Sequence, residues 1–210
     1  MRKFRDMISH RVDTPRARLA SVLFTEFVDH GFLRHLWTNV KEIDAGVFRS
    51  NQPNIWRLRR FKRRGGVSVL NLRGGRLAPV ALEIEACDDL GLEYFGMHMA
   101  STELPSRDTV LKLIEMMERL PRPVMMHCKS GADRTGLASG IYLMAFKGVS
   151  PEEAAKQLTW KHAHLWFSKK GVLRSLFKQY QPAYDKGQDF MDWVRNDYDP
   201  KAGAKGGFDG

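Results

Sequence analysis

A short apolar run that ends at a loop of small residues limits the folds open to this chain more than any other feature. Residues 123–127 read PVMMH, and the ten residues from His127 to Gly136 read HCKSGADRTG. A helical apolar pattern follows over residues 135–147, and Gly148 suits the end of that helix. A strand, a loop and a helix in this order are typical of an anion-binding loop, because backbone N–H groups and the helix N-terminus converge there.

Further short apolar runs lie beside Gly or Pro and have the length of buried strands. They lie at residues 47–49, 67–72 and 92–99. Helical patterns alternate with these runs or follow them, at residues 55–64, 80–90, 109–120, 172–180 and 190–196, and Ser150-Pro151-Glu152-Glu153 reads as a capping box for one more helix. The alternation predicts an α/β fold with a mostly parallel central sheet, flanked by helices on both faces.

The N-terminal part of the chain has a different pattern. Apolar residues recur near helical spacing over residues 16–40, with Gly31 as a break, and predict a helical extension at residues 1–43. The main domain is expected at residues 44–198. The small and polar residues 199–210 are expected to form a disordered tail.

Composition narrows the setting and the partners. No stretch approaches the roughly 20 apolar residues that span a bilayer, and residues 1–18 lack an apolar signal core, so we expect a cytoplasmic protein. The net charge of +10 predicts attraction to anionic partners. Phosphorylated proteins, small phosphate monoesters and the anionic inner face of the membrane fit this charge. Nucleic acid is not expected as a partner, because no reader motif occurs.

The ten-residue loop places a cysteine where an anion would bind. Backbone N–H groups of residues 129–134 can point inward together, and the positive end of the following helix adds to their field. The same field favours the thiolate of Cys128, which is the nucleophilic form of cysteine. We therefore expect Cys128 to attack a phosphate group that is bound by Lys129, Ser130, Gly131, Ala132, Asp133 and Arg134.

Three side chains complete the predicted site. The planar guanidinium of Arg134 can bind two phosphate oxygens at once, so Arg134→Lys is expected to impair the site. Thr135 can donate its hydroxyl to the sulfur and ease departure of the thiolate when water hydrolyses the phosphocysteine intermediate. His127 is expected to order the loop from behind. This chemistry calls for no metal ion and no cofactor.

The loop sequence HCKSGADRTG resembles the signature of the protein tyrosine and dual-specificity phosphatases, with Cys128, Arg134 and Thr135 at the matching positions. FRSNQP at residues 48–53 and VLNLR at residues 69–73 look like early segments of bacterial and fungal atypical dual-specificity phosphatases. The resemblance covers roughly residues 44–165. It implies a protein tyrosine phosphatase-like fold and a bacterial, cysteine-dependent enzyme that hydrolyses phosphate monoesters.

The general acid of the family, an Asp some thirty residues before the Cys, has no counterpart here. Three carboxylates compete for its role of protonating the leaving oxygen: Asp133 inside the loop, Glu103 in the expected acid loop, and Asp108 at the start of the next helix. Asp133 is the leading candidate, because a buried acid beside phosphate retains its proton more readily, although it can equally shape the loop or hold Lys129 or Arg73. Glu103 is the alternative acid, and Asp108 reads as a helix cap.

Other functions remain open on the residues alone. A lipid phosphate phosphatase, acting on phosphatidylglycerophosphate or a monophosphorylated inositide, is the alternative within enzymes. Lys129 resembles a residue of lipid-directed members such as the phosphatase and tensin homologue, but Ala132 replaces their second loop Lys and disfavours highly phosphorylated inositides. A rhodanese-like sulfurtransferase and a non-catalytic phosphate-binding module are further rivals.

Three features outside the loop have alternative interpretations. The basic run at residues 57–64 is either a solvated helix face or a docking surface for anionic lipid or acidic protein. Cys87 is either an ordinary core cysteine or a redox partner of Cys128. The cluster around His162 and His164 is interpreted as packing, because metal ligands at suitable spacing are absent.

Overall fold

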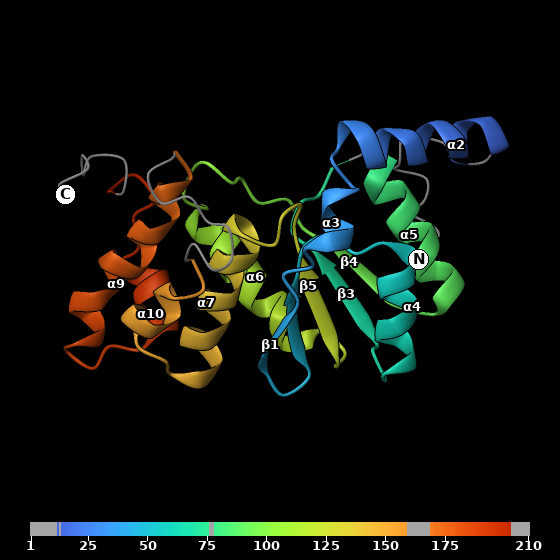
Figure 1. The fold of residues 1–210 in the computed structure, drawn as a ribbon. Coiled ribbons are helices and arrows are strands. Elements are labelled where there is room, and N and C mark those ends of the chain that lie inside the picture. Colours follow the sequence, from blue (N-terminus) through green and yellow to red (C-terminus); the bar gives the residue numbers. More distant parts are fainter. Residues whose placement is uncertain (1–11, 13, 76–77, 159–168, 203–210) are drawn as a thin grey trace. The chain divides into compact units, whose positions relative to one another are not determined.

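The computed structural model describes residues 12, 14–75, 78–158 and 169–202. The chain divides into two compact units, one made of Met1–His98 and Pro121–Ser130, the other of Met99–Leu120 and Gly131–Gly210 (Figure 1). The predictions for the cluster around His162 and His164 lie outside the described residues, as does most of the predicted tail.

The first unit contains a five-stranded sheet within the described residues. Its strands are β1 (Lys41–Asp44), β2 (Val47–Ser50), β3 (Ser68–Asn71), β4 (Glu93–Gly96) and β5 (Val124–His127). Their order is β1-β2-β5-β3-β4, with β1 antiparallel to β2 and every other pair parallel. β5 therefore has a parallel neighbour on each side, and all its residues are buried.

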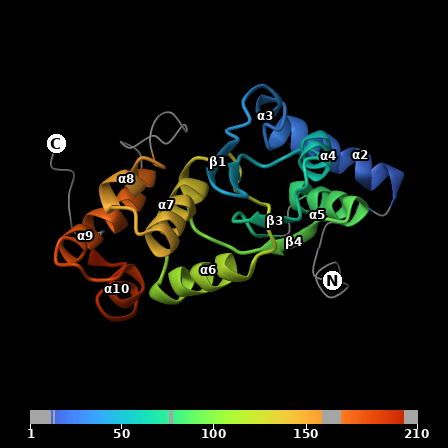
Figure 2. The ribbon, with the colours of Figure 1, turned by 90° about the horizontal axis from the view of Figure 1, so that it is seen from below.

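The helices of the first unit are α2 (Pro15–Leu23), the π-helical turn η1 (Phe24–Val28), α3 (Leu33–Leu36), α4 (Ile55–Arg63) and α5 (Ala78–Leu90). Asn54 caps α4, because its side chain accepts a hydrogen bond from the N–H of Arg57. α4 and α5 lie side by side (Figures 1 and 2). A core cluster joins them to the sheet, formed by Leu58, Phe61, Val69, Ala86, Cys87, Leu92 and Met125.

The second unit is helical in the part of it that the structure describes. Its elements are α6 (Arg107–Arg119), α7 (Asp133–Lys147), α8 (Pro151–Ala155), the 3-10 helix η3 (Lys169–Arg174), α9 (Ser175–Tyr184) and α10 (Phe190–Asn196). Two glycines of α7 allow close packing: a Cβ on Gly136 would lie 2.6 Å from the carbonyl oxygen of Gln157, and one on Gly140 would lie 2.5 Å from the ring of Phe177. α7 ends at Gly148 in the left-handed conformation, as predicted.

The α/β class and the mostly parallel sheet are confirmed, with three differences in detail. β1 was not predicted; it is a short and half-exposed strand without an apolar run. The N-terminal helices end at Val28 and Leu36, earlier than the apolar pattern over residues 16–40. Asp108 does not cap α6, because the Ser106 hydroxyl accepts the hydrogen bond from the N–H of Thr109.

Candidate active site

The loop His127–Gly136 passes from the first unit into the second, and its first half begins at the end of β5. Cys128 follows the strand directly and is 1% exposed. Backbone bonds from neighbouring segments fix this half: the N–H of Leu72 donates to the carbonyl of His127 at 2.8 Å, and the N–H of Gln52 donates to that of Lys129 at 3.2 Å. The backbone at the nucleophile is therefore tied to the residues that follow β2 and β3.

His127 lies in a buried polar network. Its Nε2 is 2.5 Å from Oε1 of Glu83, and its Nδ1 is 3.1 Å from the carbonyl oxygen of Cys128. The other oxygen of Glu83 accepts hydrogen bonds from the amide of Asn71 at 2.8 Å and from that of Gln52 at 3.2 Å. Glu83 belongs to α5, so this carboxylate connects the helix to the ends of two strands.

Lys129 contacts a carboxylate of the N-terminal helices. Its Nζ lies 3.1 Å from Oδ1 of Asp29, which follows η1 and is 5% exposed. The guanidinium of Arg73 donates two further bonds to Asp29, at 2.5 and 2.8 Å, and Arg34 donates one at 2.9 Å. Lys129 and Arg73 are therefore held by Asp29, a residue that the sequence did not single out.

Arg49 is a second cation near the nucleophile. It belongs to β2, is fully buried, and pairs in register with Met126, two residues before Cys128. Burial lowers the pKa of Arg49 to about 10, while the negative charge of a Cys128 thiolate acts in the opposite direction. Arg49 therefore remains charged at neutral pH, and its positive charge acts on the sulfur of Cys128.

The second half of the loop opens α7. Gly131 has φ of 72°, which residues with a Cβ adopt at a cost, and the N–H of Gly136 donates to the carbonyl of Ala132 at 2.8 Å. Asp133 begins the helix and is 5% exposed. Within the described residues, Nε of Arg134 and the hydroxyl of Thr135 are buried without a hydrogen-bond partner. Such groups favour a ligand that accepts hydrogen bonds.

The other two carboxylates considered as acids are on the surface. Glu103 is exposed in the segment between β4 and α6, and Asp108 is exposed in the first turn of α6. The hydroxyl of Tyr198 donates to the carbonyl of Pro105 at 2.7 Å, so the end of this segment is anchored within its own unit. Asp133 is thus the buried member of the three candidates.

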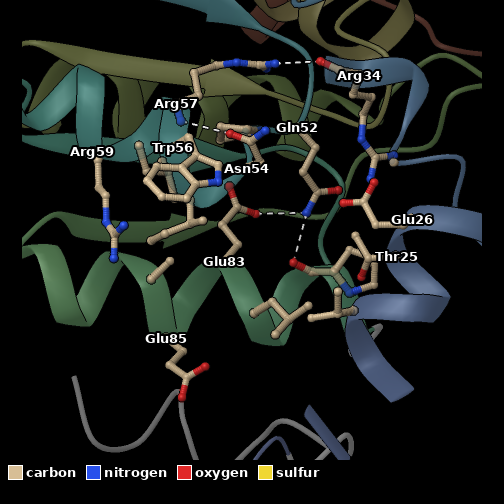
Figure 3. Close-up of a pocket in the computed structure, with 18 of the residues that line it drawn as sticks. Thr25, Glu26, Arg34, Gln52, Asn54, Trp56, Arg57, Arg59, Glu83 and Glu85 are labelled. Atoms are coloured by element: carbon tan, nitrogen blue, oxygen red, sulfur yellow. Dashed lines mark hydrogen bonds between the residues drawn. The ribbon is translucent and has the colours of Figure 1, made fainter. Parts of the chain in front are cut away.

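The basic run has an inner and an outer part. Arg57 is half-buried; its guanidinium donates to the side chain of Asn51 and, at 2.7 Å, to the carbonyl of Arg34 (Figure 3). Burial, with the nearby charge of Arg34, lowers the pKa of Arg57 to about 10. The other basic residues of the run are exposed: Arg59, Arg60, Lys62, Arg63 and Arg64. The interpretation as a solvated face therefore does not apply to Arg57.

A cavity of about 520 Å³ is lined by the N-terminal helices, α4 and α5 (Figure 3). Trp56 and Arg57 contribute to its wall, and the guanidinium of Arg59 lies 5.0 Å from the centre of the Trp56 ring. Gln52 and Glu83 also line the cavity, and both contact the backbone or side chain of the catalytic loop. The wall of this cavity therefore includes two residues, Gln52 and Glu83, that also hold the loop His127–Gly136 in place.

Cys87 packs in the apolar cluster between α4, α5 and the sheet. Burial, reinforced by the charges of Glu83 and Asp88, raises the pKa of this thiol, so Cys87 stays protonated. Oxidation proceeds through the thiolate and is therefore disfavoured here. The structure thus favours the core-cysteine interpretation.

Residues 89–184 match the model of a family described as the tyrosine phosphatase family. The match includes the whole loop from His127 to Gly136. This segment belongs to the tyrosine phosphatase family. The predicted resemblance and the prediction of a cysteine-dependent phosphatase are thereby confirmed, whereas the roles of single residues stay predictions.

Solved structures of tyrosine phosphatases and related enzymes resemble the chain in fold. TpbA of P. aeruginosa matches with a TM-score of 0.55 and 19% identity, over 75% of this chain and 89% of that chain. The core catalytic domain of the PP-IP phosphatase SIW14 from S. cerevisiae matches with a TM-score of 0.56 and 18% identity, over 71% of this chain and 89% of that chain. PTPMT1 matches with a TM-score of 0.52 and 20% identity, over 70% of this chain and 99% of that chain. A search of curated protein sequences finds no match.

Two observations bear on membranes and metals. No helix among the described residues has the length and apolar character needed to cross a bilayer. The same residues contain no cluster of three His, Cys, Asp or Glu side chains that could hold a metal ion.

Proposed function

We propose that this chain is a protein tyrosine or dual-specificity phosphatase that hydrolyses phosphate monoesters through a phosphocysteine at Cys128. The observation that carries the proposal is the position of Cys128, buried at the end of the central strand β5, in a segment that matches the tyrosine phosphatase family. The charge of Arg49 supports a thiolate there. A buried thiolate beside an anion-binding loop is a competent nucleophile.

The reaction has two steps. The sulfur of Cys128 forms a bond to phosphorus while the bond to the leaving oxygen breaks, and a general acid protonates that oxygen. Water then attacks phosphorus and gives a proton to the deprotonated general acid, the S–P bond breaks, and inorganic phosphate leaves with regeneration of the thiolate. Arg134 binds two equatorial oxygens throughout, and the hydroxyl of Thr135 donates to the departing sulfur.

Asp133 is proposed as the general acid, with Glu103 as the alternative. The burial of Asp133 at the start of α7 supports this assignment, because a carboxyl group shielded from water keeps its proton more readily. Glu103 is exposed, and the segment that carries it precedes α6 and contacts Tyr198 through the carbonyl of Pro105. The remaining predicted contacts to phosphate come from residues 129–134.

The direct test is hydrolysis of an aryl phosphate by the wild type and by Cys128→Ser. The wild type should turn over in the presence of a chelator, and the variant should lose activity by more than about a thousandfold, because an alcohol cannot replace the thiolate. Cys87→Ser is the matched control, since it changes the other cysteine, which lies in the core. Equal activity of Cys128→Ser and wild type would refute the cysteine mechanism.

Phosphorylated proteins and small phosphate monoesters are the proposed substrates. A Cys-to-Ser variant of TpbA has been solved in complex with pTyr, and PTPMT1 in complex with PI(5)P. These two complexes support a site that accepts either a phosphorylated side chain or a lipid head group. A panel of phosphotyrosine, phosphoserine and phosphoinositide substrates separates the two classes.

A lipid phosphate phosphatase is the second candidate, because residues 19–40, which include most of the N-terminal helices, expose many large apolar side chains. They are Leu19, Val22, Leu23, Phe24, Phe27, Val28, Phe32, Leu33, Leu36, Trp37 and Val40. Basic side chains of α4 are exposed in the same unit, and the whole chain carries a charge of +10. An anionic membrane surface attracts both kinds of side chain. The enzyme would then be cytoplasmic and peripheral at the inner face of the membrane.

Sedimentation with vesicles tests this candidate. The wild type should sediment with vesicles rich in phosphatidylglycerol and remain in solution with neutral vesicles. Replacing Phe27 and Leu36 by Ser should release it. Asn196→Ser, which changes an exposed and uncharged side chain of α10, is the surface control. Equal binding to both vesicle types would argue against an anionic membrane partner.

A further inference from the structure

The carboxylate of Asp29 occupies a position between two cations that border the catalytic loop. Arg73 follows β3 and Lys129 follows β5, and these strands are parallel neighbours, so both cations lie at the same edge of the sheet. Lys129 is also the residue after the nucleophile Cys128. The cations that border the predicted phosphate site are therefore already paired with an anion from the N-terminal helices.

Both carboxylate oxygens of Asp29 are bound by cationic side chains. Arg73 approaches with both of its terminal nitrogens, and Lys129 shares one carboxylate oxygen with it. Arg34 binds the other carboxylate oxygen and also the carbonyl oxygen of Asp29, each at 2.9 Å. A planar fork and an ammonium group hold a carboxylate or a phosphate in the same manner.

Asp29 is unsuited to be the missing general acid. Burial favours its protonated form, but the hydrogen bonds and charges of Arg73, Lys129 and Arg34 outweigh burial and lower its pKa to about 2. It is therefore ionised at neutral pH and has no proton to give. Its charge instead offsets cations that could attract a second anionic group of a substrate.

We propose that Asp29 fills an anion subsite formed by Arg73 and Lys129, and thereby restricts the enzyme to substrates with a single phosphate. The inference rests on the proposed function, in which the loop from Cys128 to Arg134 binds the scissile phosphate. A second phosphate beside the first must displace the Asp29 carboxylate from both cations. A substrate that carries one phosphate meets no such competition.

The test uses the full chain with Cys128→Ser, so that binding is measured without turnover, and inorganic phosphate and pyrophosphate as probes in titration calorimetry. Asp29→Ala should bind pyrophosphate at least about tenfold more tightly, while the affinity for phosphate changes by less than about threefold. Adding Lys129→Met should abolish this gain. Asp29→Asn, of the same shape, serves if the Ala variant does not fold.

Glu26→Gln is the matched control. It removes one negative charge from the same N-terminal helices, where Glu26 pairs with His35 at 3.0 Å, and leaves Asp29 in place. An equal gain in Glu26→Gln, a gain that survives Lys129→Met, or no change in the ratio of the two affinities would overturn the proposal. Failure of the proposed function is distinguished by the parent chain, which would then neither hydrolyse a phosphate monoester nor, as Cys128→Ser, bind phosphate.

Discussion

Oε1 of Glu83 lies 2.5 Å from Nε2 of His127, and both side chains are buried from solvent. Glu83 projects from α5 and His127 ends β5, so the pair joins a helix to the strand that leads into the nucleophile. Asn71 and Gln52 bind the other oxygen of the same carboxylate. One buried group thereby fixes the ends of three segments around the loop.

Glu83→Gln should lower the free energy of unfolding by about 3 kcal/mol, because a neutral amide keeps one acceptor oxygen only and loses either the contact with His127 or the hydrogen bonds from Asn71 and Gln52. Urea unfolding measures the change. Glu85→Gln is the control on the same helix, since Glu85 pairs with the exposed side chain of Arg18 and its replacement should change stability by less than about 0.5 kcal/mol. Equal stability of the two variants would contradict the role given to Glu83.

Asp133→Asn should reduce kcat by about a hundredfold or more for a substrate with a poor leaving group, because the leaving oxygen then receives no proton. The basic limb of the pH–rate profile should flatten in the same variant. For a substrate with a good leaving group, kcat of Asp133→Asn should fall much less. Glu103→Gln, exposed in its loop, should keep the wild-type profile.

The pH–rate profiles of Asp133→Asn and Glu103→Gln together decide which of the two residues is the general acid. Wild-type activity and an unchanged basic limb in Asp133→Asn would remove it as the acid. A selective loss in Glu103→Gln would move the role to that residue.

Asp29 should make stability sensitive to acid. Its pKa in the folded chain is about 2, below the ordinary 3.8, so the stabilisation is fully present above the ordinary value and is lost as pH falls toward 2. The shift in pKa corresponds to at most about 2.5 kcal/mol of stability. Urea unfolding at about pH 6 and about pH 3 should show a smaller loss for Asp29→Asn than for wild type, and parallel losses would contradict the ion-pair account.

Gly136→Ala should destabilise the second unit by about 1–3 kcal/mol, because its new Cβ would lie 2.6 Å from a backbone oxygen of Gln157. Gly148→Ala is the matched control: its Cβ would meet no atom within 4 Å, and only its φ of 61° costs energy. Thermal unfolding compares the two. A smaller effect at Gly136 than at Gly148 would show that α7 can move away from Gln157.

Much of the fold could be predicted because the decisive signals are local. Short apolar runs beside Gly or Pro located β2, β3, β4 and β5, and the small-residue loop after His127 located the start of α7 within two residues. β1 escaped because an edge strand with half-exposed residues has no apolar run to mark it. The boundaries of the main domain at residues 44–198 stay a prediction.

The supporting residues of the site could not be predicted, because they come from distant parts of the chain. Asp29, Arg49 and Glu83 each reach the loop from another element, at separations of roughly 45 to 100 residues in the sequence. One signal was present: Asp29 lies within the apolar pattern of residues 16–40, where Glu26 is the other acidic residue. A charge in such a stretch requires a partner when it is buried.

Trapping of the covalent intermediate tests the central claim most directly. The enzyme is mixed with a ³²P-labelled aryl phosphate, quenched in acid within one turnover, and digested for mapping of the labelled peptide. The account predicts label on Cys128, as a phosphocysteine that forms and decays at the rate of turnover, and no label in Cys128→Ser. Turnover with label on another residue, or with none at any time, would contradict it.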